Sequence, residues 1–137
     1  MSRHIFHCPL RWSDMDAFGH VNNVTFLTYL EQARIDLIYA AGLGEPIMSS
    51  GVVVARHEID YRAPLRYRPE PVQVQTWVSR IGNASFTVGY QVRDADTLYV
   101  EAATVLVPYD AAEGRPRRVS PAEKELLGRF LEVGRAA

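Results

Sequence analysis

Residues 11–34 read Arg-Trp-Ser-Asp-Met-Asp-Ala-Phe-Gly-His-Val-Asn-Asn-Val-Thr-Phe-Leu-Thr-Tyr-Leu-Glu-Gln-Ala-Arg, and the rest of the chain is organised around this stretch. It runs from the end of an expected strand through a polar bend into the longest amphipathic segment of the sequence. The bend holds two carboxylates, one imidazole and two carboxamides, with a glycine among them: Asp14, Asp16, His20, Asn22, Asn23 and Gly19. Keeping so many polar side chains together at the start of a helix costs free energy, and this arrangement favours a site that acts chemically on a ligand.

A plainer interpretation of the bend is that Asn22 or Asn23 caps the helix while the aspartates solvate a loop. Capping explains one asparagine well. It does not explain Asp-x-Asp-x-x-Gly-His-x-Asn-Asn as a set. We therefore expect a functional site at this bend.

Length and composition predict one globular domain over residues 1–137. The hydrophobic fraction of 47% is enough for a real core. A net charge of −1 argues against nucleic acid or an anionic membrane surface as the main partner. The first residues have no apolar segment typical of a signal peptide, and no window approaches the roughly 18 apolar residues of a membrane span. We expect a cytoplasmic protein that has no membrane partner.

The single cysteine and the N-terminal histidines do not indicate a metal or redox site. Cys8 has no second cysteine with which to form a disulfide, and we expect a small buried hydrophobic residue. His4 and His7 lie three apart, so on a strand they face opposite sides of the sheet. No carboxylate or second thiol completes a ligand set near them. We expect no bound metal.

A long helix is predicted from residue 22 or 23 to residue 41, because apolar residues recur there at spacings of three and four. These apolar residues are Phe26, Leu30, Ala33, Leu37 and Ala40. Gly42 is placed to end the helix in a left-handed conformation. Glu31 and Arg34, three residues apart, are expected to pair on the surface. Residues 43–51 are expected to form a loop.

Alternation of apolar and polar residues predicts five strands. They cover about residues 3–12, 52–62, 72–81, 84–93 and 97–108. Ser120-Pro121-Ala122-Glu123 is a capping box that predicts a short helix over about 121–131. The last four strands follow one another closely and predict an antiparallel meander that curls under its own twist. The long helix would fill the concave face of this α+β fold, and the open sheet edges favour pairing with a second copy.

In element order and in motif, the chain resembles the hotdog-fold acyl-CoA thioesterases, specifically the 4-hydroxybenzoyl-CoA thioesterase-like group. The resemblance covers about residues 3–108. It is carried by the runs at 13–23 and 29–34, with weaker similarity at 59–65 and 81–86. It implies a hotdog fold, in which a long central helix is wrapped by a curved antiparallel sheet of about five strands, with a short C-terminal helix following here. It also implies a homodimer, or a tetramer built as a dimer of dimers, with active sites at the dimer interface.

The resemblance implies that Asp16 is the catalytic carboxylate and that a backbone N–H near Asn23 polarises the thioester carbonyl. These residue types also suit the chemistry by themselves. Thioester hydrolysis needs a carboxylate that attacks the carbonyl carbon or activates water. It also needs donors aimed at the developing oxyanion, which a helix N-terminus provides. The predicted function is therefore hydrolysis of an acyl-CoA to the free acid and CoA.

Further residues are candidates for holding the substrate. His20 and Asn22 are expected to position the loop or the substrate, although His20 is equally well explained as a structural histidine. Gly19 and Phe18 are expected beside the acyl group. A basic cluster of Arg62, Arg66 and Arg68 has the charge to bind CoA phosphates, with a solvated connection as the alternative. CoA is part of the substrate, and no separate cofactor is expected.

Two other functions are compatible with the sequence. A hotdog hydratase or dehydratase would use an acid together with a histidine, as Asp16 and His20 would allow. A non-catalytic acyl-CoA-binding module is the third interpretation. A hydratase changes the absorbance of an enoyl-thioester without releasing thiol, whereas a thioesterase releases thiol. The sequence does not identify the acyl group.

Overall fold

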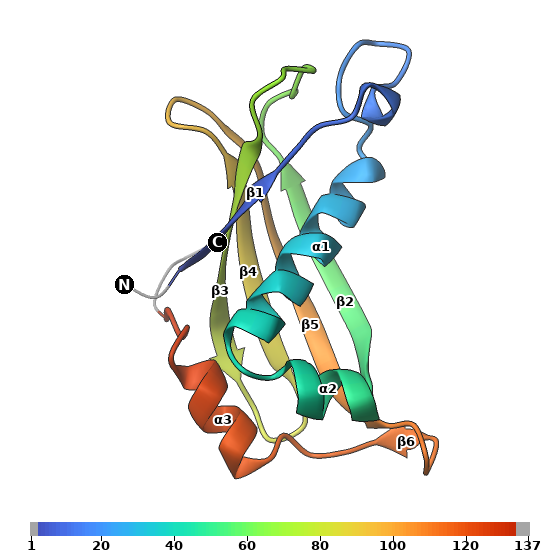
Figure 1. The fold of residues 1–137 in the computed structure, drawn as a ribbon, viewed down its shortest axis with the longest axis vertical. Coiled ribbons are helices and arrows are strands. Elements are labelled where there is room, and N and C mark those ends of the chain that lie inside the picture. The colour runs from blue at the N-terminus through green and yellow to red at the C-terminus, as the bar shows by residue number, and fades with distance from the viewer. Residues whose placement is uncertain (1–2, 134–137) are drawn as a thin grey trace.

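A curved antiparallel sheet wraps around one long helix in the computed structural model, which describes residues 3–133 except the side chain of Met48 (Figure 1). The ends of the domain expected over 1–137, residues 1–2 and 134–137, lie outside the described part. The strands are β1 (His4–Cys8), β2 (Val52–Tyr61), β3 (Val72–Ile81), β4 (Phe86–Arg93), β5 (Leu98–Asp110) and β6 (Arg115–Pro116). The helices are α1 (Thr25–Ala40), α2 (Gly44–Ser50) and α3 (Pro121–Gly128), and a short 3-10 turn covers Trp12–Asp14.

The sheet order is β1-β3-β4-β5-β2, with every neighbouring pair antiparallel and β6 paired to the end of β5. Strands β3, β4 and β5 form the expected meander. The expectation that β2 belongs to the same meander was wrong, because β2 pairs with β5 at the far edge of the sheet. The ten residues 62–71, which include three prolines, connect β2 to β3 past the two strands between them. Short turns predict adjacent strands, but a connection of this length does not.

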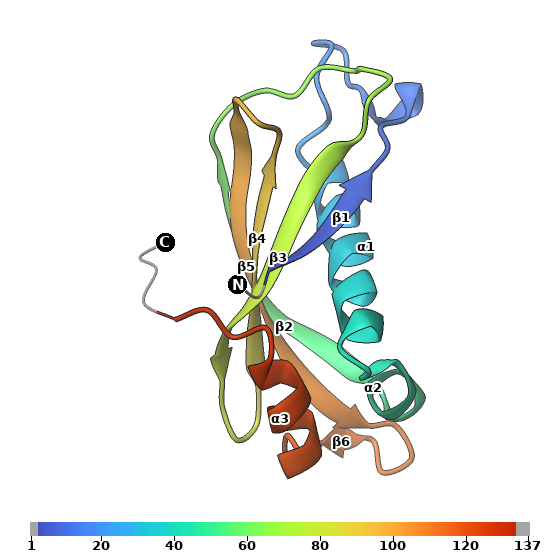
Figure 2. The ribbon, with the colours of Figure 1, turned by 60° about the vertical axis from the view of Figure 1, so that its left-hand side comes forward.

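Helix α1 fills the concave face of the sheet, as the apolar stripe predicted. Phe26, Leu30, Ala33 and Leu37 are buried, whereas Ala40, the fifth residue of the predicted stripe, is exposed in the last turn of the helix. The helix packs against β1, β3 and α2, and α3 packs against β3 (Figure 2). Gly42 follows the helix with a φ of 82°, the left-handed end that its position predicted.

Several predicted boundaries differ from the structure, including the end of α3, which is Gly128 instead of residue 131. Helix α1 begins at Thr25, two to three residues later than expected. The expected loop at 43–51 is mostly helix α2, because Pro46 sits in the first turn, where a missing N–H costs little. Strand β1 ends at Cys8 instead of continuing to residue 12, since Pro9 cannot donate to the neighbouring strand. No helix within residues 3–133 has the length and apolarity needed to cross a membrane.

Candidate active site

The polar bend folds into a tight loop between the 3-10 turn and α1. A bridge between Met15 and Val21 closes the loop at its base. Inside it, the N–H of Asp16 donates to the carbonyl of His20 over 2.9 Å, and the N–H of Gly19 donates to the carbonyl of Asp16 over 3.0 Å. Gly19 has a φ of 79°, which few other residues would adopt without strain. The loop thus holds Asp16 and His20 on neighbouring sides of one turn.

Asp14 anchors this loop and does not face solvent. It is buried, and its carboxylate accepts hydrogen bonds from the backbone and guanidinium of Arg11 and from the hydroxyl of Tyr29. Burial raises the pKa of Asp14, but the hydrogen bonds from Tyr29 and Arg11 outweigh it and hold the pKa below its usual value. The interpretation that both aspartates merely solvate a loop is therefore wrong for Asp14.

The start of α1 leaves one backbone donor free. The side-chain oxygen of Asn22 accepts the N–H of Val24 over 2.9 Å, and the carbonyl of Asn22 accepts the N–H of Thr25. The N–H of Asn23, between these groups, has no acceptor among residues 3–133. The carbonyl of Asn23 accepts the hydroxyl of Tyr61 over 2.9 Å, which ties this turn to the end of β2.

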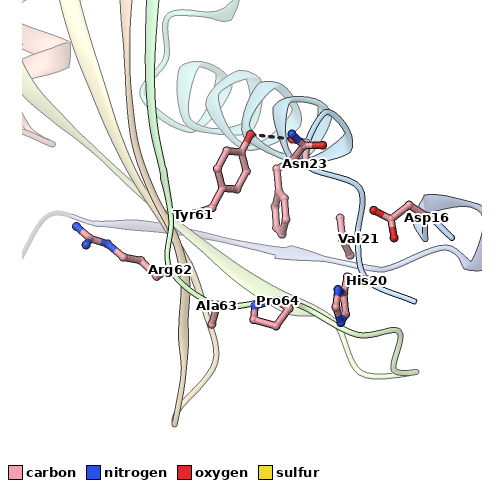
Figure 3. A pocket seen from close by; sticks show the side chains of 9 residues that line it. Asp16, His20, Val21, Asn23, Tyr61, Arg62, Ala63 and Pro64 are labelled. Carbon is pink, nitrogen blue, oxygen red and sulfur yellow. Dashed lines mark hydrogen bonds between the residues drawn. The ribbon is translucent and has the colours of Figure 1, made fainter. Parts of the chain in front are cut away.

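A cleft of about 380 Å³ opens where the loop, the helix start and the end of β2 meet (Figure 3). Its lining residues are Asp16, His20, Val21, Asn23, Phe26, Tyr61, Arg62, Ala63 and Pro64. One carboxylate oxygen of Asp16 accepts the N–H of Phe18 over 2.9 Å. The other has no hydrogen-bond partner in the part of the chain that the structure describes, so it is available to a ligand. The structure brings Asp16, His20 and Asn23 into one cleft.

The three candidate arginines diverge. Arg62 lines the cleft and donates to Glu101 over 2.7 Å. Arg66 is exposed, and its backbone bridges to that of His20. Arg68 turns away to the β4–β5 turn, where it donates to Asp94 over 2.6 Å. The predicted cluster is therefore two arginines beside the cleft and a third that holds a turn.

Asp94 stabilises the β4–β5 turn and also accepts the hydrogen bond from Arg68. It accepts hydrogen bonds from the Tyr99 hydroxyl and from the backbone of residues 96 and 97. The hydrogen bond from Tyr99 is the largest cause of a pKa for Asp94 well below its usual value, and Arg68 adds to it. Two backbone carbonyls, those of Glu70 and Pro71, also accept from Arg68. Arg68 therefore links the β2–β3 connection to the β4–β5 turn by hydrogen bonds.

The remaining expected substrate residues lie at the edge of the site. Phe18, at the loop tip, is 81% exposed, and Gly19 sits beside it with its unusual φ. Sequence reasoning missed Phe26 and Tyr61 as lining residues, whose rings are 5.9 Å apart in the cleft. The sequence predicts Phe26 in the apolar stripe of the long helix, and Tyr61 falls near the end of the strand expected over 52–62. The pairing of β2 with the far edge, which sequence spacing does not reveal, brings the two together.

Nothing among residues 3–133 forms a group of three or more histidine, cysteine or acidic side chains able to hold a metal ion. The free thiol of Cys8 is buried, as expected, and burial raises its pKa to about 11. A thiol with so high a pKa is a poor nucleophile at neutral pH. Of the groups in the cleft, the Asp16 carboxylate could attack a carbonyl carbon or accept a proton, and the His20 imidazole could also accept a proton.

Comparison with known proteins shows which family the chain belongs to. A family profile described as "Thioesterase-like superfamily" matches residues 10–130. The uncharacterized protein YsmA of Bacillus subtilis is 30% identical over 121 residues, which cover 86% of this chain and 80% of YsmA. The acyl-CoA thioester hydrolase YbgC of Escherichia coli O6:H1 is 24% identical over 96% of this chain and all of YbgC.

Among solved structures, the DHNA-CoA thioesterase of Staphylococcus aureus matches with a TM-score of 0.83. The two chains are 22% identical, and the match covers 94% of this chain and 91% of the other. At this level of sequence identity, the match shows that the two chains share a fold. The long helix inside a curled antiparallel sheet, with a short C-terminal helix, is the hotdog fold that the sequence predicted.

Proposed function

The chain belongs to the thioesterase-like superfamily and is a thioester hydrolase, and we propose that Asp16 and the Asn23 N–H carry out its reaction on an acyl-CoA. The products are the free acid and CoA. One observation supports these roles above the others: an unpaired carboxylate oxygen of Asp16 and the turn that carries the unpaired N–H of Asn23 line the same cleft. The relative YbgC, which aligns along the whole of its length, is named an acyl-CoA thioester hydrolase.

In the proposed reaction the thioester carbonyl lies between Asp16 and the start of α1. Asp16 either attacks the carbonyl carbon or takes a proton from a water that attacks it. The Asn23 N–H stabilises the oxyanion, helped by the positive end of the helix dipole. The C–S bond then breaks, and the CoA sulfur leaves as thiolate and takes up a proton. If Asp16 attacks first, water hydrolyses the resulting anhydride to restore the carboxylate.

The groups around this pair have supporting roles in the proposal. The side chain of Asn22 occupies the N–H of Val24, and Tyr61 holds the carbonyl of Asn23, so the turn stays in place while its free N–H serves the substrate. His20 positions Asp16 through the hydrogen bond between their backbones. Arg62 and Arg66 lie where CoA phosphates would approach the cleft.

Phe18 and Arg68 keep smaller roles in the same proposal. Phe18, with Gly19 beside it, covers the acyl group at the mouth of the cleft. Arg68 is occupied by Asp94 and two carbonyls, so its contribution to CoA binding is the weakest of the three arginines.

The proposed active form is a homodimer, or a tetramer made of two such dimers. Strand β2 is a sheet edge, and its side chains are exposed on both faces. Val53 and Val54, on opposite faces, are 42% and 41% exposed. An exposed apolar edge strand favours pairing with a second copy. Because Tyr61 at the end of β2 lines the cleft, pairing there would bring the partner close to the substrate.

Thiol release from a panel of acyl-CoAs tests the proposed reaction. The purified protein is mixed with acyl-CoAs of different length and polarity in the presence of a thiol-trapping dye, with an enoyl-CoA included. We expect free CoA to accumulate from at least one acyl-CoA. Loss of the enoyl absorbance without thiol release would instead identify a hydratase, and no reaction with any member would oppose the proposal.

A further inference from the structure

The imidazole of His20 lines the cleft and has no partner of its own. The residue is half-buried, and neither ring nitrogen makes a hydrogen bond or an ion pair with any of residues 3–133. Two other histidines differ from it. His4 pairs with Asp36 over 2.6 Å, and Nδ1 of His57 lies 2.9 Å from the hydroxyl of Thr104. The His20 ring supports the loop through no side-chain hydrogen bond and is therefore available to a ligand.

Backbone pairing places His20 between a carboxylate and a guanidinium. On one side, the carbonyl of His20 accepts the N–H of Asp16 over 2.9 Å. On the other side, His20 forms an antiparallel bridge with Arg66. Residues directly opposite each other on antiparallel segments point to the same face, with Cβ atoms about 5 Å apart. Asp16, His20 and Arg66 thus form one row on one face, and Asp16 and His20 both lie at the side of the cleft opposite Tyr61 (Figure 3).

The order of this row gives the direction in which the substrate lies. Asp16, at one end, has to reach the carbonyl carbon in the proposed reaction. Arg66, at the other end, is exposed, and its guanidinium has no hydrogen bond or ion pair within the described part of the chain, so it is free to bind an anion. With the CoA phosphates toward Arg66, the sulfur lies between the carbonyl carbon and Arg66. The side chain that faces the sulfur is then His20.

The departing sulfur needs a proton at this place. The thiol of CoA is an alkyl thiol like that of cysteine, whose reference pKa is about 8.5, so a proton delivered as the C–S bond breaks makes it a better leaving group. Asp16 cannot supply this proton, because it acts as the nucleophile or as the base toward water. Imidazole is the side chain most often used to transfer protons in catalysis.

We propose that His20 is a second catalytic residue, whose imidazolium donates a proton to the CoA sulfur as the C–S bond breaks. The electron pair of that bond goes to the sulfur, and CoA leaves as the thiol. If Asp16 attacked the carbonyl, the neutral imidazole next takes a proton from the water that hydrolyses the anhydride. If Asp16 activated water, it returns the proton of that water to the imidazole. Both routes restore the two side chains.

This inference rests on the proposed hydrolysis of acyl-CoA and extends it to the leaving group. The alternative is that His20 supports the loop and takes no part in the reaction. The backbone carbonyl of residue 20, which any residue can supply, accepts the N–H of Asp16. His20→Gln should therefore keep the loop folded. Glutamine is polar but does not titrate, so the change removes the proton donor.

The test varies the leaving group while the acyl group stays the same. An acyl-CoA that wild type hydrolyses is compared with the S-phenyl thioester of the same acid, and the released thiol is measured for both. Thiophenol is a much stronger acid than an alkyl thiol, so it leaves as the thiolate without a proton. His20→Gln should lower kcat for the acyl-CoA by roughly 100-fold, the low end for a positioned acid, with little change in KM. Its kcat for the S-phenyl ester should stay close to that of wild type.

His7→Gln is the matched control. It makes the same change at an exposed position of β1 outside the cleft, so both esters should be cleaved at wild-type rates. Melting temperatures accompany the rates, and His20→Asn takes the place of His20→Gln if the longer amide unfolds the protein. Equal losses on the two esters would assign His20 a supporting role and overturn the inference. An unchanged kcat for the acyl-CoA would also overturn it.

Failure of this inference can be told from failure of the proposed function. If wild type releases thiol from no acyl-CoA, the proposed function is wrong, and the role of His20 toward the CoA sulfur is wrong with it. If the inference alone is wrong, wild type hydrolyses the acyl-CoA, and His20→Gln either loses nothing or loses activity equally on both esters.

Discussion

The hydroxyl of Tyr29 donates a 2.7 Å hydrogen bond to Oδ2 of Asp14, which joins α1 to the turn that precedes the active-site loop. Burial raises the pKa of Tyr29, and the hydrogen bond to Asp14 raises it further. At neutral pH the phenol therefore keeps its proton and remains a donor. On the far side of the loop, the N–H of Val21 donates to the carbonyl of Leu65 over 2.8 Å. The loop that carries Asp16 is thus fixed on both sides.

Tyr29→Phe should destabilise the protein by about 1.5–3 kcal/mol, the usual loss for a hydrogen bond to a charged group. The ring keeps its packing, so the change isolates the hydroxyl. Urea unfolding followed by circular dichroism measures the difference. The control is Tyr39→Phe, on the exposed side of the same helix, which should unfold like wild type. Equal stability of Tyr29→Phe and wild type would show that the bond contributes nothing.

Asp14→Asn should change how stability depends on pH. The pKa of Asp14 is lower in the folded protein than in the unfolded chain, so the ionised carboxylate stabilises the fold above the unfolded value of about 4. This contribution is lost as the pH falls through the folded pKa. The difference in unfolding free energy between wild type and Asp14→Asn should therefore be full at pH 6 and shrink below about pH 4. A difference that stays constant down to pH 3 would contradict the assignment.

The sequence allowed the fold class to be predicted, and it indicated the bend at residues 13–23 as the candidate site. The bend at residues 13–23 combines a turn residue with groups that catalysis needs, and local patterns of this kind do not depend on distant strands. Asn22 and Asn23 illustrate the limit. Which of them offers a free N–H depends on where the first helical turn begins, and boundaries of helices are set by competing local hydrogen bonds.

The parts that could not be predicted depend on long-range pairing. The alternation of apolar and polar residues along 52–62 predicts a strand but does not predict which strand pairs with it. Tyr61 lines the cleft because β2 pairs with β5. Arg34 shows the same limit on the helix. A charged residue three positions from Glu31 is typical of a surface pair, and only the packing of α1 in the sheet shows that its side chain is buried.

Val54→Lys should weaken self-association, because it places a charge on the exposed edge strand β2. Sedimentation velocity at micromolar concentration is expected to show a dimer or tetramer for wild type and a shift toward monomer for the variant. Ile5→Lys, on the strand at the opposite edge of the sheet, is the matched control and should associate like wild type. A fully active wild-type monomer at this concentration would contradict the proposed dimer.

Asp16→Asn should lower kcat for thiol release by at least ~100-fold, the low end for a positioned acid–base group. Asparagine keeps the side-chain oxygen that accepts the N–H of Phe18, so the loop should stay folded, with an unchanged melting temperature. Substrate binding should change far less, because the carboxylate acts at the carbonyl carbon or its water. Asp14→Asn is a poor control, because Asp14 is buried and accepts hydrogen bonds from Arg11 and Tyr29. The control is Asp96→Asn, in an exposed turn, which should keep full activity. Thiol release close to the wild-type rate by Asp16→Asn would exclude Asp16 as the catalytic carboxylate.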